Sequence, residues 1–165
     1  ADQGRVEVGI ASVPKSRIGP NAIPLMADPL GIICRADHAL VALDRPVTWS
    51  DLDGHAFMAN GICSFISAPA MRSVLERSSL MVRNTTSLIA LVTEGVGITI
   101  LPQLSMPAGH DQLRFLPIEG VTDLRRLYVV TRANSALSPA VEAFIEALLE
   151  TVAVRGWGEN SDAAE

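Results

Sequence analysis

The clearest pattern of apolar and polar positions along the chain lies in the segment 82–102. Its first half spaces apolar residues at i, i+3 and i+4, which predicts one apolar face of a helix: Leu88, Leu91 and Val92. Asn84 or Thr85 can cap this helix, because short polar side chains accept hydrogen bonds from its first N–H groups. The apolar run 96–101 then predicts a buried strand, which Pro102 ends. A helix followed directly by a buried strand is typical of parallel α/β sheets.

Weaker patterns of the same two kinds predict the remaining elements. Apolar runs rich in β-branched residues predict strands at 4–11, 23–26, 30–34, 56–59, 113–118 and 126–131. Helices are predicted at about 68–77, with Pro69 in the first turn, and from Pro139 to about Val154. Apolar positions share one face of the last helix: Val141, Phe144, Ile145, Leu148 and Leu149. Strands and helices thus alternate, and the sequence has no internal repeat.

Composition places the chain among α/β proteins with an aliphatic core. Its 165 residues are 48% hydrophobic but only 4% aromatic, and they suffice for one ordinary domain or two small lobes. No stretch approaches the roughly 18 apolar residues of a membrane span, so we expect no membrane contact. The net charge of −5 does not attract phosphate backbones, so we do not expect this part to touch DNA itself. The start of the sequence shows no cationic, apolar leader, which favours the cytoplasm.

The sequence carries no pattern of catalytic or metal-binding residues. The histidines His38, His55 and His110 are not spaced as metal ligands. The motifs G-x-S-x-G, G-x-x-x-x-G-K and G-x-G-x-x-G do not occur. Gly95 and Gly97 follow a helix rather than a strand, which is the wrong order for a phosphate-binding loop. We therefore expect neither an enzyme nor a cofactor or metal.

Four segments, in the correct order, resemble the effector-binding region of LysR-type transcriptional regulators. GRVEVGIA is similar to the family's G-x-x-D-x-x-I strand, with Glu7 in place of Asp. ICRADHAL resembles a strand that ends in R-x-x-H-P-L, with Ala39 in place of proline. The run NTTSLIALVTEGVGITILP is close to a polar cap followed by L-V-x-x-G-x-G-I-x-x-L-P. LYVVTRANSALSPAVEAFIEALL is similar to the closing strand and helix.

The resemblance implies an α/β fold like the type II periplasmic binding proteins, with two lobes and two crossovers. Lobe I then comprises 1–26 and the return strand, C-terminal helix and tail in 125–165, whereas lobe II is 27–124. The DNA-binding helix-turn-helix, its linker and the first units of lobe I are expected before Ala1, which leaves lobe I incomplete. DNA is then bound only through that preceding domain. The family also implies a homodimer or homotetramer.

In open α/β sheets, ligands lie at the carboxyl ends of strands, where helix N-termini favour anions. Two segments of lobe II and one hydroxyl of lobe I fit this position: Gly61, Ile62, Cys63, Ser64 and Phe65; Asn84, Thr85 and Thr86; and Ser12. The alternative is that Ser67, Asn84 and Thr85 are only helix caps. The resemblance implies a small, carboxylate-like effector that binds between the lobes and controls transcription.

Two other functions fit parts of the sequence. NGICSF resembles the loop that carries the reactive cysteine of peroxide-sensing members of the family, and a helix N-terminus would lower the pKa of the Cys63 thiol. No second cysteine follows it, however, and Cys34 lies in an apolar strand, so a small pocket residue is preferred. A solute-binding protein for transport would share the fold, but should carry an export leader and a complete first lobe.

Overall fold

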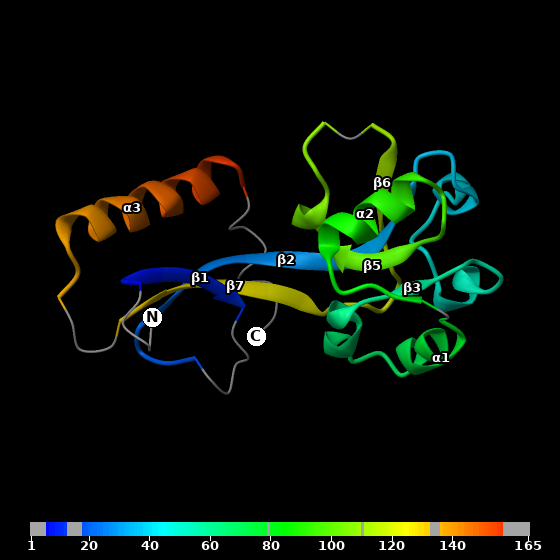
Figure 1. Ribbon diagram of the computed structural model, residues 1–165, viewed down its shortest axis with the longest axis horizontal. Helices are drawn as coiled ribbons and strands as arrows, with labels where there is room; N and C mark the ends of the chain where they lie inside the picture. The colour runs from blue at the N-terminus through cyan, green and yellow to red at the C-terminus, as the bar shows by residue number, and fades with distance from the viewer. Residues whose placement is uncertain (1–5, 13–17, 79, 110, 133–135, 157–165) are drawn as a thin grey trace. The chain divides into compact units, whose positions relative to one another are not determined.

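The computed structural model of the chain describes residues 6–12, 18–78, 80–109, 111–132 and 136–156 (Figure 1). The chain forms two compact units. The first consists of Ala1–Asp28 and Arg125–Glu165, and the second is the continuous segment Pro29–Leu124. The chain enters the second unit within strand β2 (Ala22–Arg35) and leaves it at the start of strand β7 (Leu124–Thr131).

The first unit packs one helix against three strands. Strand β1 (Val8–Ser12) pairs antiparallel with β7, and β7 lies next to β2 in the sheet. Helix α3 (Pro139–Val154) lies along these strands (Figure 1), as its sequence predicts. Its buried side chains share a core with the strands: Leu25, Met26, Val129, Val141, Ile145 and Val152. Phe144, which was predicted to share that face, is instead 48% exposed, because it lies at the edge of the helix's apolar stripe.

The second unit is built around the second half of β2. Leu30–Ile33 pairs with strand β5 (Thr99–Pro102), and Gly31–Arg35 pairs with strand β6 (Leu113–Pro117). Ile32 and Ile33 point to opposite faces, and each belongs to its own buried cluster. Both faces of β2 are therefore covered, which explains why this stretch is continuously apolar.

Two expectations about the strands need correction. The two predicted pieces 23–26 and 30–34 form one strand, because the fixed φ of Pro24 and Pro29 suits extended backbone. The sequence predicted that β5 lies in a parallel sheet, and this prediction is wrong for its pairing with β2, because the two strands run antiparallel. Parallel pairing occurs instead between β3 (Met58–Ala59) and β4 (Leu80–Met81) and in the bridge of Phe57 with Ile98.

Short helices connect the strands of the second unit. Helix α1 spans Ala70–Arg77 and helix α2 spans Thr85–Thr93, and there are 3-10 turns at Ala39–Ala42, Trp49–Leu52, Gly61–Phe65 and Gln103–Ser105. Asn84 caps α2 as predicted, with its Oδ1 accepting from Ser87 N at 2.9 Å. Ser67 does not cap α1, whose N-cap is Pro69. Within the described residues, no helix is long and apolar enough to cross a membrane.

Candidate functional site

The predicted binding segments of the second unit begin at neighbouring strand ends. Strands β3 and β4 are parallel, and Val82 N donates to Ala59 O at 2.9 Å. Their carboxyl ends therefore meet at one edge, from which β3 continues into the turn Gly61–Phe65 and β4 continues toward α2. Ile62 packs against the buried cluster that contains Leu88 of α2. The structure thus brings the two predicted segments close together.

Asn60 fixes the turn that follows β3. Its buried amide accepts from Ile62 N at 2.8 Å and donates to Thr99 Oγ1 at 3.0 Å and Ile100 O at 2.9 Å. The Thr99 hydroxyl in turn donates to Met58 O at 2.8 Å. Asn60 directly follows the predicted strand 56–59, and no role was predicted for its side chain. Its preference for the N-cap position is the signal that could have identified this anchor.

A surface hollow of about 620 Å³ lies between this turn and α1. We call it the Ser64 hollow, and it is lined by Cys63, Ser64, Ile66, Ser67, Ala68, Pro69, Met71, Arg72 and Leu75. Of the predicted site residues, Cys63 and Ser64 line it. Sequence reasoning missed Arg72, because a basic residue near the start of a helix resembles any solvated surface charge.

The Ser64 hollow presents hydroxyl groups and one cation. The Ser64 hydroxyl donates to Gly61 O at 2.8 Å, which leaves its oxygen lone pairs available as acceptors. Ser67 donates its N–H and its hydroxyl to the carboxylate of Asp123. Arg72 is the only charged lining residue, and among the described residues no ion pair or hydrogen bond holds its exposed guanidinium.

Cys63 is a buried thiol on the wall of this hollow. Burial raises the pKa of the Cys63 thiol above its ordinary value of 9.0 and outweighs the hydrogen bonds of the turn, which lower it. The expectation that the start of a helix would lower this pKa is therefore wrong. Burial likewise raises the pKa of Cys34 to about 11. Both thiols stay protonated near neutral pH, which argues against a peroxide-reactive thiolate.

Six further predicted site residues are exposed on the surface. Gly61, Phe65, Thr85 and Thr86 are exposed, as is Asn84, whose Oδ1 is engaged in the α2 cap. Ser12 is the exposed last residue of β1 in the first unit, opposite Leu127. Their contact with a ligand stays a prediction.

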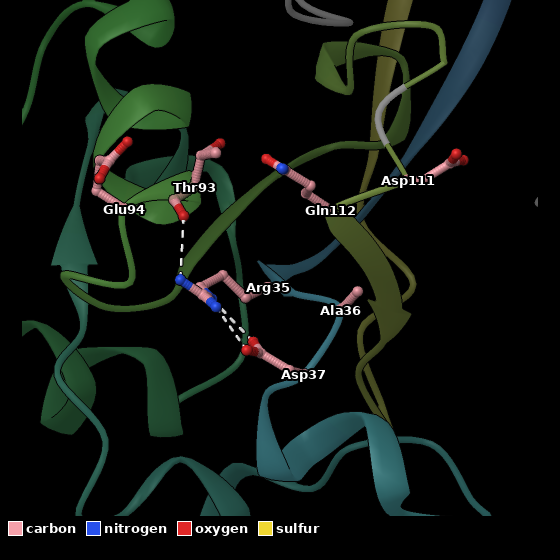
Figure 2. A pocket seen from close by; sticks show the side chains of 7 residues that line it. All are labelled: Arg35, Ala36, Asp37, Thr93, Glu94, Asp111 and Gln112. Atoms are coloured by element: carbon pink, nitrogen blue, oxygen red, sulfur yellow. Dashed lines mark hydrogen bonds and ion pairs between the residues drawn. The ribbon is translucent and has the colours of Figure 1, made fainter.

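A second hollow of about 480 Å³ lies at the C-terminal end of α2 (Figure 2). We call it the Arg35 hollow, and it is lined by Arg35, Ala36, Asp37, Thr93, Glu94, Asp111 and Gln112. The Arg35 Nε lies 2.8 Å from Asp37 Oδ1 and the Nη2 lies 2.5 Å from Oδ2, while Nη1 reaches Thr93 O at 3.5 Å. The Arg35 guanidinium is thus already hydrogen-bonded within the protein. Its hydrogen bonds to Asp37 lower the pKa of that carboxyl.

Neither hollow contains a recognisable metal site. Within the described ranges, no group of three or more histidine, cysteine, aspartate or glutamate side chains could hold an ion. His38 instead supports the chain: its Nδ1 accepts from Leu40 N at 3.2 Å and caps the turn Ala39–Ala42. The R-x-x-H segment therefore has a structural role, because its histidine stabilises the turn that follows β2.

The fold defines a class of proteins, those with a periplasmic-binding-protein-like fold. The chain is similar to the regulatory domain of Synechocystis PCC6803 CcmR in complex with 2-PG, with a TM-score of 0.66 and 23% identity over 90% of this chain and 74% of that chain. It is also similar to the BenM effector-binding domain with benzoate, with a TM-score of 0.63 and 19% identity over 99% and 77% of the two chains. Likenesses at this level of identity show the fold.

Sequence comparison gives the family. The model described as LysR substrate binding domain matches residues 1–153, and the chain belongs to this family. The uncharacterized HTH-type transcriptional regulator YbhD of Escherichia coli K12 is 28% identical over 150 residues, which are 84% of this chain and 44% of that protein. The chain spans about half the length of the curated relatives it matches, which are transcriptional regulators.

Proposed function

We propose that the chain is the effector-sensing part of a LysR-type transcriptional regulator and takes a small anionic metabolite in the Ser64 hollow. The family match and the regulators among its relatives support the first half of this proposal. The ligands of CcmR and BenM, 2-PG and benzoate, support the size of the ligand, and benzoate also supports its charge.

The proposal that the ligand is an anion rests on the chemistry of the Ser64 hollow. An arginine fork matches a carboxylate or phosphate group with two parallel hydrogen bonds, and Arg72 offers this fork in the hollow that Ser64 also lines. The chain as a whole carries a net charge of −5, so the cation does not belong to a generally basic surface. The effector then places one acidic oxygen pair on Arg72 and a further polar group near Ser64.

Control of transcription follows from a difference in affinity. An effector that binds one arrangement of the regulator more tightly than another shifts the population toward it. A helix-turn-helix domain ahead of this chain then reads DNA in the cytoplasm, and a homodimer or homotetramer transmits the change. We also propose Ser12 of the first unit as a further contact of the ligand.

Calorimetric titration of the chain with benzoate and with 2-PG tests the proposal. Ser64→Ala should weaken binding of a probe by about threefold to tenfold, because the Ser64 hydroxyl can turn its hydrogen from Gly61 O to the bound anion, and the variant loses this hydrogen bond to a charged group. Ser73→Ala, an exposed serine next to Arg72 on α1, is the matched control and should leave the affinity unchanged. Equal affinities of the two variants would remove Ser64 from the site, and no binding of either probe would contradict the proposed ligand class.

A further inference from the structure

We propose that Asp123 is a built-in competitor of the effector: its carboxylate holds the donors of Ser67 until an anion enters the Ser64 hollow. This inference rests on the proposed function. Release of Asp123 then frees the segment that leads into β7. Asp123 is thus a positioning residue. It links binding of the effector in the hollow to the segment through which the chain passes from the second unit to the first.

The contact itself is a charge-assisted cluster between residues 56 positions apart. Ser67 N donates to Asp123 Oδ2 at 3.2 Å, and Ser67 Oγ lies 3.0 Å from Oδ1 and 3.2 Å from Oδ2. Ser67 lines the hollow together with Ser64 and Arg72. The donors that a ligand carboxylate would use on this wall are therefore occupied by a carboxylate of the protein, which shows that they suit this group.

The carboxylates of Asp123 and of the ligand exclude each other at Ser67, because like charges repel. A ligand anion held by Arg72 brings a second negative charge to the hollow that Ser67 lines, and two neighbouring anions repel each other where few cations compensate them. Among the described residues that line the hollow, Arg72 is the only charged one. Binding of the effector therefore weakens the bond between Ser67 and Asp123.

The position of Asp123 gives its release a consequence. It directly precedes β7, and the boundary between the two units falls between Leu124 and Arg125. Upstream, Glu119 N is fixed to Val47 O at 2.8 Å. Downstream, Arg125 Nη2 is fixed to Asp28 Oδ2 at 2.6 Å, and the Asp28 side chain is fully buried. Between these two fixed points, Asp123 holds the chain to Ser67.

The test combines calorimetry with hydrogen exchange on the whole chain, with benzoate and 2-PG as probes. Asp123→Asn removes the competing charge and should tighten probe binding by about threefold to tenfold. In the unaltered chain, the probe should slow exchange in peptides of 60–69 and speed it in those of 119–127. In Asp123→Asn, exchange in 119–127 should already be fast, and the probe should add nothing.

Two further variants complete the experiment. Asp53→Asn removes the same charge from an exposed acid that pairs with Arg77 at the other end of α1, and should change probe affinity less than about twofold. Ser67→Ala should reduce the gain from Asp123→Asn, because the contested hydroxyl is gone and only the backbone N–H of residue 67 remains as a contested donor. Unchanged or weakened binding in Asp123→Asn, with the probe still bound by the unaltered chain, overturns this inference alone. Failure of every variant to bind either probe overturns the proposed function and this inference together.

Discussion

The Ser64 hollow and the Arg35 hollow belong to the same unit and have similar volumes, about 620 and 480 Å³, yet their chemistry is opposite. The Ser64 hollow combines two hydroxyls with one arginine that no described residue pairs. The Arg35 hollow holds an arginine whose fork is filled, together with three carboxylates: Asp37, Glu94 and Asp111. An arginine in a hollow therefore predicts an anion site only when its own partners leave it available.

The Arg35 hollow is better understood as a joint between β2 and α2. Arg35 reaches the carbonyl of Thr93 in the last turn of the helix, where a cation is favourable. Gly95 then turns the chain with φ of 77°, and a Cβ there would lie 3.3 Å from Arg35 Cδ. Gly95 after the helix and Arg35 at the end of the strand thus share one packing contact.

Substitutions of Arg72 and Arg35 should show the largest difference in ligand affinity between the two hollows. Arg72→Glu should weaken binding of benzoate by about a hundredfold, because a charge-assisted bidentate contact is replaced by repulsion. Arg35→Gln should leave the affinity within about twofold of the unaltered chain. Calorimetry measures both, and a large loss in Arg35→Gln with none in Arg72→Glu would transfer the site to the other hollow.

The anchor of the Ser64 hollow is buried, and its removal should lower stability. Asn60→Ala deletes three hydrogen bonds and leaves Ile62 N–H without its acceptor, which should lower the free energy of unfolding by about 2–4 kcal/mol. Asn84→Ala removes one exposed cap and should cost about 1 kcal/mol. Urea denaturation compares the two, and equal losses would show that the buried network does not hold the turn.

The ion pair of the Arg35 hollow should give a smaller effect that depends on pH. Arg35 lowers the pKa of the Asp37 carboxyl from its ordinary 3.8, so this carboxyl stabilises the folded chain above that pH. The contribution is lost as the pH falls further through the folded pKa. Asp37→Asn should therefore flatten the loss of stability in acid relative to the unaltered chain. Thermal unfolding across this range measures the difference, and identical slopes would show that the pair contributes nothing.

Local signals in the sequence account for much of the fold. The Asn84 cap, the strand ending at Pro102 and the helix 139–154 each depend on residues close in sequence, and the structure has all three. The direction of pairing between β5 and β2 depends on contacts about 70 positions apart, on which an apolar run carries no information.

The site was less accessible to sequence reasoning than the fold. Of the predicted residues, Cys63 and Ser64 line the Ser64 hollow, and a polar turn after a buried strand is the local signal on which that prediction rested. The Asn60–Thr99 bond joins residues 39 positions apart, and the Ser67–Asp123 contact joins residues 56 apart. Arg72 is a candidate ligand contact only because no ion pair or side-chain hydrogen bond holds it among the described residues, and a spacing pattern does not encode this.

A titration followed by amide NMR tests the central claim most directly, because it reports on both hollows at once. Addition of benzoate or 2-PG should shift the amide signals of 61–69 and the Arg72 Nε–H, and should leave those of 93–95 and 111–112 in place. Shifts concentrated around Arg35, Thr93 and Gln112, or none at saturating probe, would contradict the assignment of the effector to the Ser64 hollow.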